Sequence, residues 1–200
     1  MSDQPKNRAF PRKEWFDLQP SRCMWEDGPW NKEPDRVQWE HVGLPCLLIR
    51  NDLGAWCGYV GVYIESLLFG VTDIEIPSAH WDVNSFESSI YNDRLWLESP
   101  PPVDAPIDLD NIEEAIENHV RVSLRVWFFG FDCCHAGDLA PGMYAMYRQI
   151  KQMNGHIFAG ERNVTYKDYA YVTRTCEQMA EEIREIEQRL RNKARGLEIP

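Results

Sequence analysis

The chain has 200 residues, of which 44% are hydrophobic and 26% charged, a composition typical of globular rather than disordered or fibrous proteins. Thirty-two acidic and 21 basic residues give a formal net charge of −11, which argues against a nucleic-acid binder because such proteins hold phosphates with Lys and Arg. The sequence has neither an apolar run that could span a bilayer nor the apolar core of a secretory signal. We therefore expect no membrane contact, a cytoplasmic location and reduced cysteines.

The first 40 residues are rich in tryptophan and proline. Trp15, Trp25 and Trp30 are interspersed with prolines that would break a helix. We expect residues 1–40 to form an irregular segment that wraps around a single α+β domain formed by residues 41–196.

A β-hairpin is predicted over residues 44–64. An apolar run is followed by Asn-Asp-Leu-Gly at 51–54, a sequence typical of turns, and then by a run of aromatic and β-branched residues. Gly58 in this second run indicates a bulge or a backbone that another group approaches closely. Trp56 and Tyr59 beside it are either core residues or a stacking platform for a base or sugar.

An acidic, proline-rich insertion is expected at residues 98–118, because residues 98–117 contain seven Asp or Glu and no Lys or Arg. It leads into residues 119–131, where apolar and polar residues alternate before a fully apolar end. This alternation predicts a long strand with one face in the core.

A C-terminal amphipathic helix is predicted over about residues 166–195. Apolar residues from Tyr169 to Leu190 recur at alternating spacings of three and four. Thr165 is the expected N-cap and Gly196 the stop. The apolar stripe fits either packing on the sheet or contact with a second copy of the chain, which would form a homodimer.

Together these elements predict an α+β fold. Its antiparallel sheet contains the hairpin, the long strand and one or two shorter strands, and the C-terminal helix covers it.

Reactive side chains concentrate directly after the long strand, at a strand end, where functional sites commonly lie. Asp132, His135 and Asp138 are spaced by three, so a tight loop would bring two carboxylates and an imidazole together. With His80 as a remote fourth ligand, this set suits a divalent metal ion. Without a metal, His135 is a candidate general base, an aspartate fixes its tautomer and Cys133 is a candidate nucleophile. A structural His/Asp network with a buried thiol also explains these residues.

Residues from other elements are expected to converge on the same cleft as ligand-binding groups. These are Tyr59 and Trp56 from the hairpin, His80, and Tyr166 at the start of the helix.

Four segments of the chain, Trp56–Val62, His80, Trp127–Asp138 and Tyr166–Val172, follow one another in a characteristic order. In this the chain resembles a family of uncharacterised phage and prophage proteins. Its members carry a Gly-Tyr-Val-Gly-Val hairpin, a His-Gly-Gly-Leu-Thr segment, a Trp-Trp-Phe-Gly-Phe-Asp-Cys-Ala-His-x-Gly-Asp block and a Tyr-Arg-Asp-x-x-Tyr-Val helix start. Here the histidine is followed by Trp-Asp instead of Gly-Gly, and Cys134 replaces the alanine. The resemblance implies a phage context, hence the cytoplasm of a bacterial host, and it supplies no reaction.

Two functions of different classes remain open. The first is a phage accessory protein whose His/Asp/Cys-lined site binds or hydrolyses a small nucleotide-like molecule, such as a host-defence signal. The negative net charge disfavours a highly phosphorylated ligand unless Arg121, Arg125, Arg148 or a metal offsets it locally. The alternative is a non-enzymatic inhibitor that binds a host protein through its acidic insertion or its tryptophan-rich segment.

Overall fold

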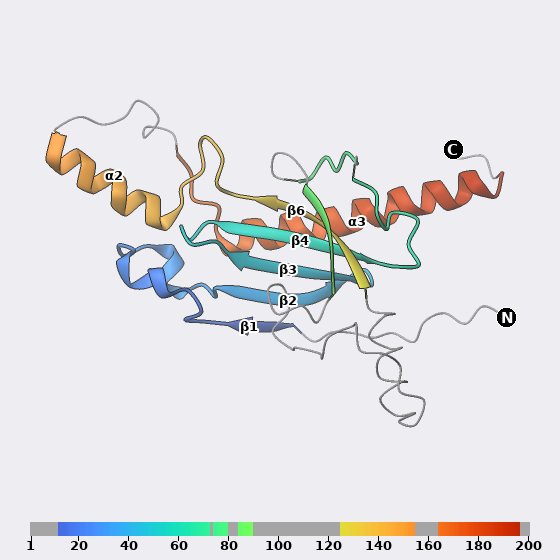
Figure 1. The fold of residues 1–200 in the computed structure, drawn as a ribbon, viewed down its shortest axis with the longest axis horizontal. Helices are drawn as coiled ribbons and strands as arrows, with labels where there is room; N and C mark the ends of the chain where they lie inside the picture. Colours follow the sequence, from blue (N-terminus) through green and yellow to red (C-terminus); the bar gives the residue numbers. More distant parts are fainter. Residues whose placement is uncertain (1–11, 73, 80–83, 90–124, 155–163, 197–200) are drawn as a thin grey trace, which may run out of the picture.

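The computed structural model describes residues 12–72, 74–79, 84–89, 125–154 and 164–196. The described residues form an α+β fold in which the long C-terminal helix α3 lies along one face of an antiparallel sheet (Figure 1). The elements in chain order are β1 (Lys13–Trp15), η1 (Pro20–Met24), η2 (Pro29–Lys32), β2 (Arg36–His41), β3 (Leu44–Arg50), β4 (Trp56–Tyr63), β5 (Asn84–Ser89), β6 (Arg125–Asp132), α2 (Pro141–Asn154) and α3 (Tyr169–Ala194).

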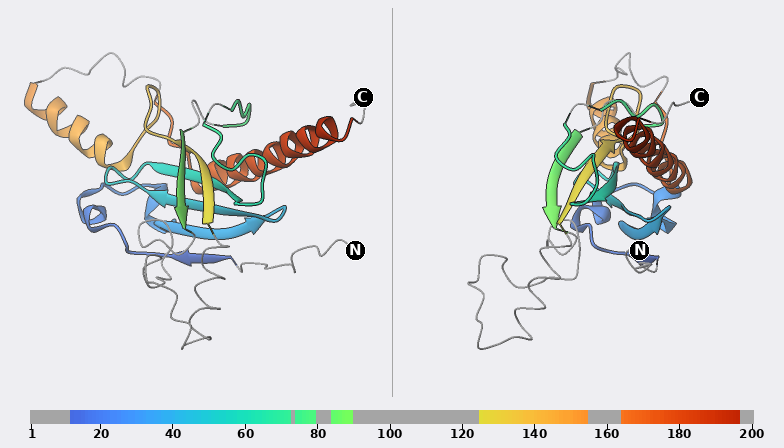
Figure 2. Two further views of the ribbon diagram at one scale, coloured as in Figure 1. Left: turned by 45° about the vertical axis from the view of Figure 1, so that its right-hand side comes forward. Right: turned by 90° about the vertical axis from the view of Figure 1, so that its right-hand side faces the viewer.

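The sheet has six strands in the order β1-β2-β3-β4-β6-β5, and every neighbouring pair is antiparallel. Strands β5 and β6 cross β2, β3 and β4 at a steep angle, which shows the strong twist of the sheet (Figure 2). Helix α2 projects away from one end of the sheet (Figure 1). The expected α+β fold, with its sheet covered by the C-terminal helix, is therefore confirmed.

The predicted hairpin is present as β3 and β4. The Asn51 side-chain oxygen accepts hydrogen bonds from the backbone N–H groups of Leu53 and Ala55, both at 3.0 Å. Gly54 has a φ of 80°, a left-handed conformation that glycine adopts without a steric penalty. These two residues explain why the chain turns here.

Helix α3 packs on β4 at the glycine singled out in the sequence. A β-carbon at Gly58 would lie 2.4 Å from the Phe131 ring and 3.1 Å from Cys176 Sγ on α3. The strand pairing continues through Gly58 on both sides. This glycine therefore permits the close approach of its neighbours and does not form a bulge.

The ends of α3 differ in how well the sequence predicted them. The prediction of Thr165 as N-cap was wrong, because Asp168 takes that role and its carboxylate accepts the backbone N–H of Tyr171 at 2.8 Å. Thr165 instead pairs through its backbone with the turn that holds Gly137. Gly196, with a φ of 69°, follows the helix as expected.

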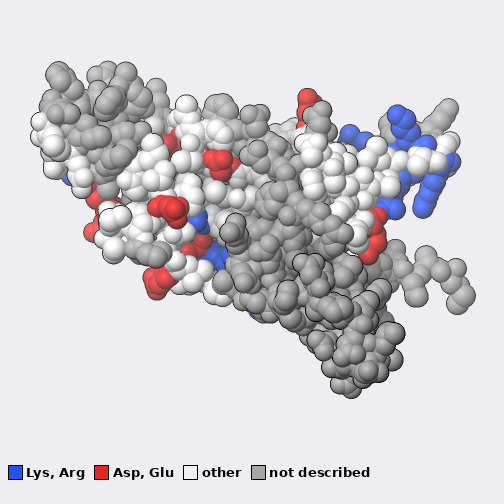
Figure 3. All heavy atoms as spheres, in the orientation of Figure 1, with Lys and Arg blue, Asp and Glu red and all other residues white. Residues whose placement is uncertain are grey.

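The apolar stripe of α3 packs mainly against its own chain. Ile183 is fully buried and Ile186 packs against the core, whereas Leu190 is 39% exposed. Lys and Arg side chains gather around the free end of the helix (Figure 3), where they interact favourably with the helix dipole. Among the described residues of α3, Leu190 is the large apolar side chain that is left exposed for contact with a second copy of the chain. No helix in the described ranges has the length and apolarity needed to cross a membrane.

The N-terminal segment is more regular than expected. Strand β1 and most of β2 fall within residues 1–40, and β2 pairs with β3 over its whole length. Strand β2 alternates between Val37 and Trp39, which face the core, and Arg36 and Gln38. This pattern is typical of a strand, but it was not recognised because prolines surround it. Helix α2 was also not predicted. His80, the insertion at 98–118 and residues 119–124 lie outside the described residues.

Candidate functional site

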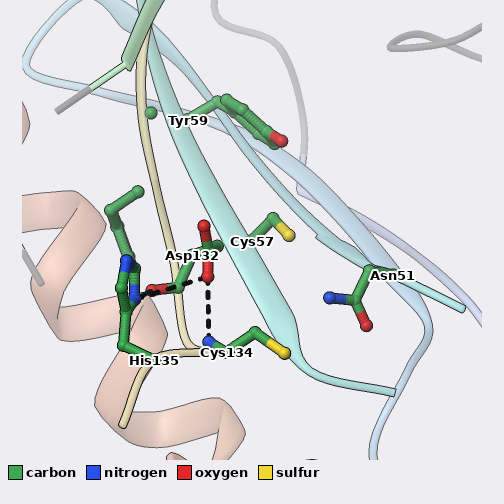
Figure 4. Close-up of a pocket in the computed structure, with 8 residues that line it drawn as sticks. Asn51, Cys57, Tyr59, Asp132, Cys134 and His135 are labelled. Atoms are coloured by element: carbon green, nitrogen blue, oxygen red, sulfur yellow. Dashed lines mark hydrogen bonds and ion pairs between the residues drawn. The ribbon is translucent and has the colours of Figure 1, made fainter. Parts of the chain in front are cut away.

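A pocket of about 430 Å³ lies where the β3–β4 turn, β4 and the end of β6 meet (Figure 4). Tyr59 and Asp132 face this pocket, whereas Trp56 and Val60, at alternate positions of β4, belong to the core under α3. The pocket is lined by Asn51, Cys57, Tyr59, Gly130, Phe131, Asp132, Cys134 and His135.

The register of β4 and β6 brings the pocket residues together. Cys57 pairs with Asp132, and Tyr59 pairs with Gly130, and directly opposed residues of antiparallel strands share one face of the sheet. A β-carbon at Gly130 would lie 2.3 Å from Cδ1 of Tyr59. The Tyr59 ring therefore lies over Gly130 and forms one wall of the pocket.

The turn after β6 forms the opposite wall. One oxygen of Asp132 accepts the backbone N–H of Cys134 at 2.9 Å, and a carboxylate oxygen of Asp138 accepts that of His135 at 3.1 Å. Gly137, with a φ of 97°, lets the chain turn sharply between them. Both aspartates thus fix the backbone that presents His135.

His135 and Asp132 form a carboxylate–imidazole pair. Nδ1 of His135 lies 3.4 Å from the same Asp132 oxygen and 3.2 Å from the Asp132 carbonyl oxygen. Because both neighbours accept hydrogen bonds, we assign the proton of the neutral ring to Nδ1 and the lone pair to Nε2. The second oxygen of Asp132 points toward the Tyr59 side of the pocket (Figure 4) and has no hydrogen-bond partner among the described residues.

Burial disfavours the thiolate form of the cysteines near the site. Burial raises the pKa of Cys57 to about 12, and it also raises the pKa values of Cys134 and Cys133. Cys133, the expected nucleophile, is buried in the core on the α3 side, because it follows Asp132 and side chains alternate along the strand. The structure thus argues against a thiolate attack in this pocket.

Asp138 shapes the turn and does not line the pocket. Only 8% of this residue is exposed, and its carboxylate lies 3.8 Å from Nζ of Lys167. No group of three or more His, Cys, Asp or Glu side chains within the described part of the chain could hold a metal ion. The metal set expected from Asp132, His135, Asp138 and His80 therefore receives no support from its first three members.

Trp56 and Tyr166, expected as ligand-binding residues, lie in a separate buried network. The Arg50 guanidinium stacks 4.1 Å from the Trp56 ring centre and donates to Tyr166 Oη at 2.8 Å and to Glu33 Oε2 at 2.5 Å. Tyr166 also donates to Glu33, and its ring contacts that of Trp30. This Arg50 network joins the N-terminal segment to the residues before α3.

Sequence reasoning missed five residues of the pocket lining, Asn51, Cys57, Gly130, Phe131 and Cys134. The position of Cys57 was predictable, because it shares strand parity with Tyr59. Asn51 carried only a turn signal. Its oxygen is occupied by the turn, and its amide nitrogen faces the pocket (Figure 4).

Comparisons of this chain with models of protein families, with curated proteins and with solved structures found no match.

Proposed function

We propose that this protein binds a small nucleotide-like molecule in the pocket, with Tyr59, Asp132 and His135 as its main contacts. The observation that carries the proposal is the convergence of an aromatic wall, a carboxylate–imidazole pair and the Asn51 amide on one pocket of about 430 Å³. Small-molecule sites commonly have this size and combine apolar walls with a few fixed polar groups.

The pocket residues favour the base or sugar of such a molecule over its phosphates. None of the described lining residues is Lys or Arg, and an uncompensated phosphate beside Asp132 would be repelled. The open oxygen of Asp132 can accept an N–H or O–H group, and Nδ2 of Asn51 can donate. Burial raises the pKa of Tyr59, so its phenol stays neutral and adds no charge to the pocket.

The resemblance to phage proteins makes a nucleotide signal of host defence a reasonable ligand. Binding alone would sequester such a signal. The pairing of His135 with Asp132 favours hydrolysis as a second step, because the unprotonated Nε2 that we assign to His135 could take a proton from an attacking water.

The test is calorimetric titration of the purified protein with nucleosides, mononucleotides and cyclic mono- and dinucleotides, with product analysis by mass spectrometry. At least one compound should bind one-to-one, and His135→Ala should weaken that binding roughly tenfold or more. His41→Ala is the matched control, because His41 also pairs with a carboxylate, that of Glu181 at 3.0 Å, outside the pocket. Equal affinities of the two variants, or binding of no compound, would contradict the proposal.

A second function, binding of a host protein, is favoured by exposed apolar side chains in the N-terminal segment. Phe16 is 50% exposed and Met24 72% exposed, whereas Trp25 and Trp30 are buried. Aromatic residues and methionine are enriched at the cores of protein–protein interfaces relative to the rest of the surface. If this function holds, Phe16→Ser with Met24→Ser should abolish capture of one specific host protein and leave nucleotide binding unchanged.

A further inference from the structure

Arg36 on β2 is a buried cation with unused hydrogen-bonding capacity. The residue is only 5% exposed. Among the described residues, neither Nε nor Nη2 of its guanidinium has a hydrogen-bond partner. The guanidinium lies 5.9 Å from the Trp15 ring centre, a cation–π contact that gives these two N–H groups no hydrogen-bond acceptor. Buried N–H groups of a cation are costly when they lack acceptors, and an anion is the partner that would satisfy both.

The strand register places Arg36 in line with the pocket. Arg36 pairs with Ile49, Ile49 pairs with Cys57, and Cys57 pairs with Asp132. All four residues belong to one row across the sheet, and directly opposed residues share a face. Neighbouring strands are about 4.8 Å apart, so the Cα atoms of Arg36 and Cys57 are separated by roughly 10 Å.

Arg36 thus lies on the same row of the sheet as Cys57 and Asp132 of the pocket lining. A molecule whose neutral ring contacts Asp132 and Tyr59 could extend along this row over Ile49, whose side chain is partly exposed. Its far end would then meet a planar guanidinium, which binds phosphate oxygens through two parallel hydrogen bonds. Desolvation lowers the pKa of Arg36 to about 10, so the group still carries its charge at neutral pH.

We propose that Arg36 binds the phosphate of the molecule whose base or sugar occupies the pocket, which makes the ligand a nucleotide rather than a nucleoside. This inference rests on the proposed function and specifies its ligand class. It also explains how an acidic protein with no Lys or Arg in the described pocket lining could recognise a phosphorylated molecule.

The test compares adenosine and guanosine with their 5′-monophosphates and 5′-diphosphates, by titration of the wild type and of Arg36→Met, which keeps the volume and removes the charge. The wild type should bind the phosphorylated form roughly tenfold or more tightly than the nucleoside. Arg36→Met should lose this preference and keep the nucleoside affinity. Arg189→Met, which changes the net charge equally at an exposed position, should retain the preference.

A second arm needs no pocket ligand. Pyrophosphate should raise the urea midpoint of the wild type and not that of Arg36→Met, and without any anion Arg36→Met should be at least as stable as the wild type. The inference is overturned if the wild type binds nucleoside and nucleotide equally, or if Arg36→Met still prefers the nucleotide. Either result would leave the proposed function intact. If no nucleoside or nucleotide binds, the proposed function fails. In that case an Arg36-dependent effect of pyrophosphate supports the anion site, and its absence overturns it.

Discussion

Replacement of Arg50 by methionine should destabilise this protein more than any exposed charge change. Nε of Arg50 donates to the Pro34 carbonyl at 3.1 Å, and Nη1 donates to the Gly54 carbonyl at 2.6 Å. Nη2 donates to Glu33 and to Tyr166. The Arg50 side chain is 0% exposed and that of Glu33 12% exposed, so water cannot replace these bonds.

The size of the effect follows from these contacts. Removal of one partner of a buried ion pair costs about 3–5 kcal/mol, because the other charge is left without compensation. Glu33 would keep its hydrogen bond from the backbone N–H of Tyr169 at 3.0 Å and the one from Tyr166, which favours the lower end of that range. The methionine retains apolar contact with Trp56, so the cavity contribution is small.

Urea unfolding followed by tryptophan fluorescence measures the loss. The double variant Arg50→Met with Glu33→Gln removes both charges. Its loss of unfolding free energy should be smaller than the sum of the two single losses by about 1 kcal/mol or more. Arg189→Met is the exposed control, since its pair with Glu185 has side chains 62% and 65% exposed, and it should cost less than about 1 kcal/mol. A loss below about 1 kcal/mol for Arg50→Met, or strictly additive effects, would refute this reasoning.

Three further predictions concern the pocket, pH and thiol access. Gly130→Ala places a carbon 2.3 Å from the Tyr59 ring, so it should cost about 1–3 kcal/mol in urea unfolding and weaken ligand binding in titration; an unchanged affinity would exclude that ring from the site. Burial raises the pKa of Glu187, but its hydrogen bonds and the charges of nearby arginines outweigh this and lower it. The carboxylate therefore stabilises the fold above its ordinary pKa of 4.5, and this contribution disappears as pH falls. The loss of unfolding free energy caused by Glu187→Gln should shrink between pH 7 and about pH 3. A loss that stays constant with pH would contradict this. Iodoacetamide should label exposed Cys23 in the folded protein and buried Cys133 only after unfolding, as read by peptide mass spectrometry.

The elements with strong local signals were predictable from the sequence. The turn at Asn51 and Gly54 and the three-and-four spacing of α3 act within a few residues of the chain, and both elements are present. Strand β2 was missed because its alternation is short and lies beside prolines. Helix α2 begins with Pro141 and Gly142. Because glycine is a poor helix former, the sequence at this position did not clearly indicate a helix start.

The site was predicted in part. Asp132, His135 and Tyr59 meet as expected, because the turn after β6 and the pairing of β4 with β6 follow from local patterns. Trp56 and Tyr166, expected beside them, do not line this pocket and lie in the Arg50 network. Because side chains alternate between the two faces of a strand, the spacing of Trp56 and Tyr59 already places them on opposite faces. The hydrogen-bond partners of Tyr166 are 116 and 133 residues away in the chain, so no sequence pattern near Tyr166 indicates them.

The Arg50 network also has a consequence for the order in which the chain folds during synthesis. Glu33 and Tyr166 are 133 residues apart, so at about 5–20 residues per second the ribosome needs about 7–27 s to supply the second partner after the first. During that interval Trp30 lacks the aromatic contact that Tyr166 provides at 5.1 Å. Trp30 therefore reaches its final packing only after residues near 166 have been synthesised.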